Sequence, residues 1–148
     1  MTPEQKRELL QELCARLPYG VKCQRGGYIE DLEGIHPLMV HSVYLTDKDG
    51  CTFNHHIEEV KPYLRTIASM TEKEVQYLFD TLQVNEEDRK EWLKVNDIGV
   101  VRLFTEEGKD FYEIADAMDY LYSIHVDFRG VIHRKLAIEA PEGMYKID

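Results

Sequence analysis

The chain has 148 residues, of which 43% are hydrophobic and 31% charged, and its formal net charge is −10 at pH 7. This length allows one domain or two very small ones, and the composition is typical of a globular protein rather than a disordered one. The acidic excess opposes non-specific binding of nucleic acid, which needs a basic surface.

The charge is uneven, because residues 1–65 carry a net charge of −2 and residues 66–148 a net charge of −8. A solvated helical surface is the simpler explanation of the acidic half. An acidic face for a basic partner, or mimicry of nucleic acid, is the alternative.

The sequence indicates a cytoplasmic protein that makes no membrane contact. No apolar run approaches the about 20 residues of a membrane span, and Met1–Gln5 lacks the apolar core of a signal peptide. The three cysteines are odd in number and do not have the spacing of a disulfide framework. We expect no cofactor, since no phosphate-binding glycine loop, nucleophile elbow or pair of catalytic carboxylates is present.

The N-terminal segment predicts a helix over residues 3–17. Thr2 can cap it, Pro3 suits the first helical position, and Gln5 falls at the third position of a capping box. Pro18 and Gly20 end it. One apolar stripe runs along this helix and consists of Leu9, Leu10, Leu13 and Leu17.

Residues 18–65 read as five short strands with a single helical turn before the last. The expected strands cover residues 21–24, 28–35, 38–46, 51–55 and 62–64. Asp49-Gly50 favours a hairpin between the third and fourth strands. Residues 57–60 are too few for an ordinary helix and suit one tight turn. Pro62 suggests that the last strand lies at an edge.

This order of elements predicts an α+β fold, in which a small SH3-like antiparallel β-barrel is flanked by an N-terminal helix and a C-terminal helical region. An open antiparallel sheet with a helix across one face is the alternative. We expect residues 1–148 to form a single compact domain, in which the helix of residues 3–17, the barrel-like part of residues 18–65 and the mainly helical part of residues 70–148 follow one another. Thr66–Ser69 is the candidate hinge.

In the C-terminal part, Thr71 and Glu74 form a second capping box and predict a helix to about Leu82. A short helix over 86–93 and a strand over 99–104 follow. Residues 105–113 are ambiguous, because Phe111-Tyr112 can pair as a strand or Asp110 can cap a helix.

From Ile114 the helical period is clear, with one face formed by Ile114, Ala115, Met118, Leu121, Tyr122 and His125. Asp127 then predicts the cap of a last helix over residues 128–136, which Pro141 and Gly143 stop.

Three segments of the sequence together carry a resemblance to a known family. They are residues 13–21, residues 60–65 with 69–71, and residues 125–132 with 136–145. The chain resembles a family of small proteins of uncharacterised function from gut Bacteroidetes genomes, their prophages and phages. The resemblance implies a phage or mobile-element setting and no particular reaction. Members usually have Tyr in place of Phe128 and Gly in place of Lys135, and the missing hydroxyl argues against chemistry at residue 128.

Four groups of residues are candidates for a site. The first is a metal site at Cys51, His55 and His56, which Cys23 or His41 could join. Adjacent residues of a strand point to opposite faces, so His55 and His56 are poorly placed to share one ion.

The second candidate is a cysteine nucleophile. Cys14 lies on the first helix, where packing is the commoner role. Cys23 lies near Lys22 and Arg25, which lower a thiol pKa where the thiol is exposed.

The third candidate is a basic contact for phosphate or an acidic partner that includes Arg129 and His133, four residues apart on the last expected helix. A capped helix whose basic end suits its dipole is the structural alternative.

The fourth is an aromatic groove for a peptide or nucleic acid in the expected barrel, unless the aromatic side chains point into the core. It would consist of Tyr28, Tyr44, Phe53 and Tyr63, together with Lys22 and Arg25.

These patterns favour a non-catalytic interaction module of mobile-element or phage type that binds a protein partner. A nucleic-acid-binding small barrel and a small metal-dependent hydrolase are the alternatives. The sequence does not specify an oligomeric state.

Overall fold

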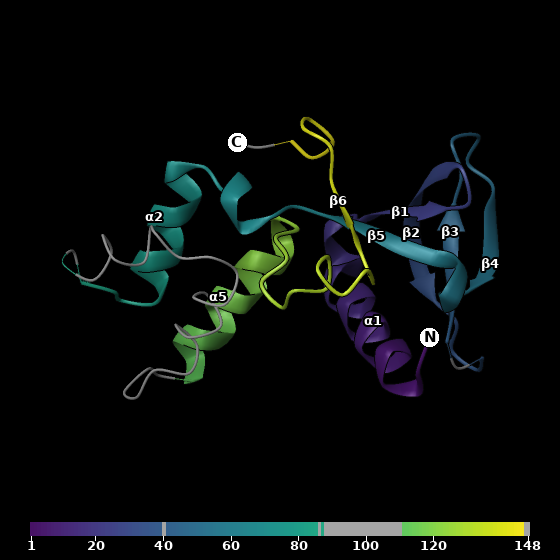
Figure 1. Ribbon diagram of the computed structural model, residues 1–148, viewed down its shortest axis with the longest axis horizontal. Coiled ribbons are helices and arrows are strands. Elements are labelled where there is room, and N and C mark those ends of the chain that lie inside the picture. The colour runs from purple at the N-terminus through teal and green to yellow at the C-terminus, as the bar shows by residue number, and fades with distance from the viewer. Residues whose placement is uncertain (40, 86, 88–110, 147–148) are drawn as a thin grey trace. The chain divides into compact units, whose positions relative to one another are not determined.

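The computed structural model describes residues 1–39, 41–85, 87 and 111–146 (Figure 1). It combines helices with a six-stranded sheet, so the predicted α+β class is confirmed. The chain divides into two compact units. Unit 1 consists of Met1–Leu64 and Val131–Ala140, and unit 2 of Arg65–Gly130 and Pro141–Asp148. Within the described part of the chain, every helix is too short or too polar to cross a bilayer.

Unit 1 begins with helix α1, Pro3–Arg16, which starts where the sequence predicts. The Gln5 backbone N–H donates to Thr2 Oγ1 at 3.1 Å, and the Thr2 N–H donates to Gln5 Oε1 at 2.9 Å. Each side chain therefore satisfies a donor that the first turn would leave unpaired. The short helix η1, Leu17–Tyr19, follows and ends at Gly20 with a φ of 72°, a conformation that favours glycine.

The sheet belongs to unit 1. Its strands are β1 (Lys22–Arg25), β2 (Tyr28–Ile35), β3 (Ser42–Thr46), β4 (Thr52–His56), β5 (Val60–Leu64) and β6 (Ile138–Glu139). They lie in the order β4-β3-β2-β1-β5-β6, and only the β5–β6 pair is parallel. The predicted tight turn before β5 is the helix η2, Ile57–Glu59.

The predicted SH3-like barrel is not confirmed, because the sheet is open. β4 pairs with β3 at one end of the sheet, and β6 takes the outer side of β5 at the other end, so β5 is not free to close on β4. β5 is therefore not the predicted edge strand. Pro62 is tolerated there because pairing with β6 begins only at Tyr63. The open-sheet alternative describes the fold better, although β6 makes the sheet mixed.

The third strand is shorter than predicted and begins at Ser42. His36 Nδ1 accepts hydrogen bonds from the Leu38 N–H at 3.1 Å and the Met39 N–H at 2.8 Å, which folds residues 36–39 into a turn. His41 has a φ of 68°, which no extended strand allows. These local bonds divert the backbone from the ladder although the residues favour a strand.

The core of unit 1 joins α1, the sheet, η2 and the 131–137 segment. Its fully or nearly fully buried members are Leu9, Leu13, Val21, Cys23, Leu32, Val43, Leu45, Ile57, Val60, Leu64, Val131, Leu136 and Ala137. α1 contributes the predicted leucine stripe. The 131–137 residues are distant in sequence and fill the same core, so unit 1 is complete only with both of its segments.

Ion pairs tie α1 into unit 1. Glu12 and Arg16 are completely buried, and Glu12 Oε2 accepts hydrogen bonds from Arg16 Nε at 3.2 Å and Nη2 at 3.0 Å. Arg134 makes a two-pronged ion pair with Glu8. Lys6 Nζ lies 2.9 Å from a carboxylate oxygen of Glu58 in η2. The last two pairs link α1 to the 131–137 segment and to η2, whereas the Glu12–Arg16 pair lies within the helix.

Unit 2 contains η3 (Ile67–Ser69), α2 (Glu72–Thr81) and α5 (Phe111–Ser123). The predicted capping box at the start of α2 is confirmed, and Leu78 and Phe79 are buried. The start of α5 agrees with the helical alternative for this stretch, although Asp110 lies outside the described residues.

On α5 the predicted face is partly right. Leu121 and Tyr122 are buried and Met118 is half-buried, but Ala117, which the prediction omitted, is completely buried. The expected helix over 86–93 and strand over 99–104 lie outside the described residues.

The predicted helix over 128–136 is wrong, because these residues form turns. Asp127 does not cap a helix. Its Oδ1 accepts a hydrogen bond from the Arg129 N–H at 3.2 Å, which closes a local turn instead. Gly130 follows with a φ of 73°, so the backbone leaves the helical region at the point where the helix should propagate.

Among the described residues, three segments end in the same way, namely α2, α5 and the 131–136 turn. In each, one backbone N–H donates to the C=O five residues earlier, and the N–H of the preceding residue donates to the C=O three residues earlier. This pair of hydrogen bonds is the Schellman motif. The residue in the left-handed conformation is Gln83 (φ 52°) after α2, His125 (φ 60°) after α5 and Lys135 (φ 62°) in the 131–136 turn. Glycine usually occupies this position, so each of these turns carries strain from a side chain.

We therefore expect Lys135→Gly to raise the free energy of unfolding. Relief of the left-handed strain is worth about 1–2 kcal/mol, and the greater freedom of glycine in the unfolded chain offsets part of it, leaving a gain of about 0.5–1 kcal/mol. Chemical denaturation of the full chain measures this gain. Lys135→Ala is the matched control, because it removes the side chain and keeps the strain. Equal effects of the two variants would contradict the explanation.

Candidate interaction site

Strand β4 forms one end of the sheet, and in the described part of the chain no further strand pairs with its outer side (Figure 1). Thr52, Phe53, Asn54 and His56 are exposed, and His55 is half-buried. β4 has no lysine, proline or acidic residue, and its register with β3 contains no bulge. Sheets commonly protect an edge with one of these features. β4 is thus an unprotected edge.

The register with β3 determines which backbone groups of β4 point outward. Hydrogen bonds flank the ladder at both ends, from Asp47 N to Cys51 O at 2.9 Å and from Ile57 N to His41 O at 2.7 Å. Bonded and non-bonded pairs alternate along an antiparallel ladder, so the odd-numbered residues of β4 bond to β3. The N–H and C=O groups that face away from β3 belong to Thr52, Asn54 and His56.

Exposed apolar side chains flank this edge on both faces of the sheet. Phe53 is opposite Leu45 on the core face, yet 56% of it is exposed. On the other face, Asn54 Nδ2 lies 3.8 Å from Met39 Sδ. Met39 is 51% exposed and the adjacent Leu38 is 87% exposed. We call Leu38, Met39 and Phe53, with the outward backbone groups of β4, the β4 edge site.

The turn that carries Leu38 and Met39 is fixed rather than loosely attached. The His36 ring accepts the two hydrogen bonds from the N–H groups of this turn. The same ring stacks on Tyr44 of β3 with a centroid distance of 5.5 Å. The Ser42 N–H donates to Met39 O at 3.2 Å and closes the turn. The backbone that carries the two side chains is therefore ordered by these bonds before any partner binds, which reduces the backbone entropy lost on binding.

Carboxylates surround the β4 edge site. Those near it along the chain and ladder are Glu33, Asp47, Asp49, Glu58 and Glu59. Lys48 is the lysine in the hairpin, and Lys6 is paired with Glu58 at 2.9 Å. Hydrogen bonding to Lys6 lowers the pKa of Glu58, so this carboxylate is charged at neutral pH. The edge thus combines a strand without Lys, Arg, Asp or Glu, which exposes one aromatic side chain, with neighbouring carboxylates.

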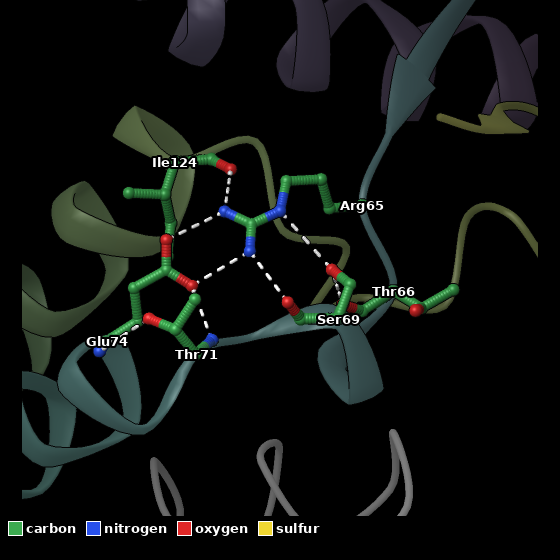
Figure 2. Close-up of polar contacts among 6 residues, drawn as sticks. All are labelled: Arg65, Thr66, Ser69, Thr71, Glu74 and Ile124. Carbon is green, nitrogen blue, oxygen red and sulfur yellow. Dashed lines mark hydrogen bonds and ion pairs between the residues drawn. The ribbon is translucent and has the colours of Figure 1, made fainter. Parts of the chain in front are cut away.

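An extensive polar network is centred on Arg65 in unit 2 (Figure 2). Its Nη1 and Nη2 donate to the two carboxylate oxygens of Glu74 at 2.9 and 2.8 Å. Nη2 also donates to Ser69 O at 2.9 Å, Nε to Ser69 Oγ at 3.2 Å, and Nη1 to Ile124 O at 3.3 Å. The guanidinium is therefore bonded in all directions, leaving little for a ligand.

The backbone of Arg65 belongs to the same network. Its N–H donates to His125 O at 2.8 Å, and the Asp127 N–H donates to Arg65 O at 2.8 Å. Residues after α5 are thus held beside the start of unit 2 by an isolated parallel bridge. Arg65 connects η3, the first turn of α2 and the end of α5, which is a structural role.

The carboxylate of Glu74 is held in its charged form. Burial by itself would raise the pKa of Glu74, but hydrogen bonds from Arg65 and Thr71 and the positive charge of Arg65 outweigh burial and lower it. Glu74 also accepts from the Thr71 N–H at 2.8 Å, so the capping box and the ion pair share one side chain.

The structure does not gather the predicted metal ligands. Among the described residues, no group of three or more His, Cys, Asp or Glu side chains could hold a metal ion. Cys51 is exposed in the hairpin before β4, whereas His55 and His56 point to opposite faces of that strand. His55 Nδ1 lies 3.7 Å from a Glu59 carboxylate oxygen.

The two cysteines predicted as possible nucleophiles have different surroundings. Cys23 is completely buried in the core of unit 1, and burial together with the charges of Asp31 and Glu30 raises its pKa to about 12. Such a thiol is inert at neutral pH. Cys14 is exposed on α1, and its partial burial raises its pKa.

The predicted aromatic groove is not assembled as one surface. Tyr28 is 66% exposed and lies beside Arg25, whose Cζ is 5.6 Å from the ring centroid. Through the register of β2 and its bulge, Tyr44 lies on the opposite face of the sheet from Tyr28. Tyr63 is 8% exposed and pairs with Ile138 of β6.

The predicted basic contact is also divided. Arg129 is half-buried and belongs to unit 2, whereas His133 is exposed and belongs to unit 1. They are not on one helix, since residues 128–136 form turns. Arg134, in the same turn, is used for the ion pair with Glu8.

Sequence reasoning missed two features of these sites. Leu38 and Met39 were assigned to a strand, although Pro37 beside them signals a turn. The ion pair of Arg65 was missed because the capping box accounts for Glu74 without it, and nothing local shows that Glu74 has a second partner.

The comparisons with known proteins add no relative. No protein-family model, curated protein or solved structure matches the chain.

We expect Arg65→Leu to destabilise the protein by about 3–5 kcal/mol, because it leaves the buried Glu74 carboxylate without its partner. Lys22→Ala is the control, since its ion pair with Asp31 is exposed and worth at most about 1 kcal/mol. Urea denaturation at pH 7 compares the variants.

Because the pKa of Glu74 is lowered in the folded protein, the stability that this carboxylate contributes is present above about pH 4.5 and is lost as the pH falls further. The cost of Arg65→Leu should therefore shrink in acid, and a constant cost would contradict this assignment.

We also expect a thiol reagent at pH 8 to label Cys51 and Cys14 and to spare Cys23. With a pKa of about 12 and no exposed surface, Cys23 should react at least about a hundredfold more slowly than Cys51. Mass spectrometry of labelled peptides measures the rates, and denatured protein, in which all three react, is the control. Rapid native labelling of Cys23 would restore it as a candidate nucleophile.

Proposed function

We propose that the chain is a non-catalytic interaction module that binds a protein partner through the β4 edge site. The observation that carries this proposal is the combination of an unprotected strand edge with the exposed side chains of Leu38, Met39 and Phe53. Exposed apolar groups that gather around one edge are typical of protein-binding surfaces.

Two observations weigh against the alternatives. The carboxylates around β4 repel a phosphate backbone, as does the net charge of −10, so nucleic-acid binding gains no support. The described residues hold no three-ligand metal group, so a metal-dependent hydrolase gains none either. The resemblance to phage and prophage proteins suggests that the partner comes from a phage or its bacterial host.

Affinity capture from a native host lysate, with and without nuclease, tests this proposal. We expect a stoichiometric protein partner that survives nuclease and is reduced at least about tenfold by Phe53→Glu or Leu38→Glu. Ile29→Glu is the matched control, because Ile29 is 53% exposed on β2 of the same sheet and receives the same charge. It should leave capture unchanged.

Two results would refute the proposal. Loss of the partner on nuclease treatment would make nucleic-acid binding the favoured function. Full capture by both edge variants would show that the β4 edge site is not the binding surface.

A further inference from the structure

We propose that the β4 edge accepts an extended segment of the partner as a seventh strand, antiparallel to β4, and that this segment carries Lys or Arg at both ends of the paired stretch. This inference rests on the proposed function and specifies the chemistry of the partner. Its three supports are the outward backbone groups, the apolar side chains on both faces and the charge around the edge.

Backbone hydrogen bonds would supply the recognition. The outward N–H and C=O groups of Thr52, Asn54 and His56 are spaced as in a regular ladder, because the β3–β4 register has no bulge. In an antiparallel pair, each such residue exchanges two hydrogen bonds with the residue opposite it. Asn54 is at the centre of β4, so its N–H is the group whose loss would weaken the added strand most.

The side chains around the edge favour an alternating partner sequence. Successive residues of an added strand point to opposite faces. One set would contact Phe53 on the core-face side, and the other would contact Met39 on the other side. Small apolar or β-branched residues suit both, so the central stretch should be rich in Val, Ile and Thr.

The charges decide between a basic segment and a second copy of this chain. If two copies paired antiparallel through β4, Asp47 and Asp49 of each would lie beside Glu59 of the other, and like charges would repel. Glu58 adds little to this repulsion, because it is paired with Lys6 at 2.9 Å and lies 4.0 Å from the N-terminal ammonium. A partner segment with Lys or Arg at both ends would instead meet these carboxylates at each end of β4. A basic segment therefore fits this edge better than self-association.

Selection from a display library of random linear peptides, each of about ten residues, tests the inference on the full-length protein. Enriched peptides should share a central alternation of apolar residues flanked by Lys or Arg. A synthetic copy of one enriched peptide is then titrated by nuclear magnetic resonance. Its binding should slow hydrogen exchange at the Thr52, Asn54 and His56 amides and should weaken at least about tenfold when its basic residues are replaced by Glu.

A pair of variants at one position isolates the backbone contribution. Asn54→Ala and Asn54→Pro remove the same side-chain contact, but only proline removes the outward N–H, and neither removes a bond to β3. We expect Asn54→Ala to bind the peptide nearly as well as the wild type and Asn54→Pro to bind it at least about tenfold more weakly.

Several results would overturn the inference. They are equal binding by the two Asn54 variants, enriched peptides without basic ends, a library without enriched peptides, and unchanged exchange of the three outward amides. The amide measurement and the charge-swapped peptide use the wild type, so they remain decisive if Asn54→Pro does not fold. A captured protein that is lost with Phe53→Glu but retained with Asn54→Pro would leave the proposed function standing and exclude strand addition.

Discussion

A charge can be buried only if its hydrogen bonds are replaced, and both units of this protein are built around an arginine under that constraint. In unit 1, Arg16 is completely buried against Glu12 one helical turn away, so the side of α1 that carries them is fixed inside the unit. In unit 2, Arg65 bonds to Glu74, Ser69 and a carbonyl at the end of α5. In unit 2 an arrangement that moved any of these groups would leave the buried Arg65 charge unpaired, which favours one packing of η3, α2 and the end of α5. In unit 1 the pair lies within one helix, and its burial requires that this side of α1 remain inside the unit.

The phrases on which the family resemblance depends lie within these structural contacts. Residues 65, 69 and 71 belong to the Arg65 network, and residues 125–127 join it through the backbone. Residues 13 and 21 meet residues 136 and 137 in the core of unit 1. These phrases therefore lie at positions that determine how the chain folds.

Local signals predicted the elements well, and non-local pairing explains the errors. Both capping boxes and the tight turn before β5 depend on residues within three or four positions, so the sequence alone located them. The sheet is open, and its sixth strand joins through Tyr63 pairing with Ile138, which no local pattern reveals. That β4 remains at an edge also depends on this order of strands, which no local pattern of its residues specifies. At Asp127 the local signal was ambiguous, because a side chain that can cap a helix can also close a turn.

The second segment of unit 1 has a consequence for biosynthesis. When residues 1–64 have left the ribosomal exit tunnel, α1 and β1–β5 are available for folding. Val131, Leu136, Ala137 and β6 have not yet emerged at that point. The nascent sheet would then have two unpaired edges and an unfilled core while unit 2 is being translated. Unit 1 can complete its folding only when residue 140 has left the exit tunnel. A fragment that ends after β5 would therefore have the incomplete core of this intermediate and would not reproduce the fold of unit 1.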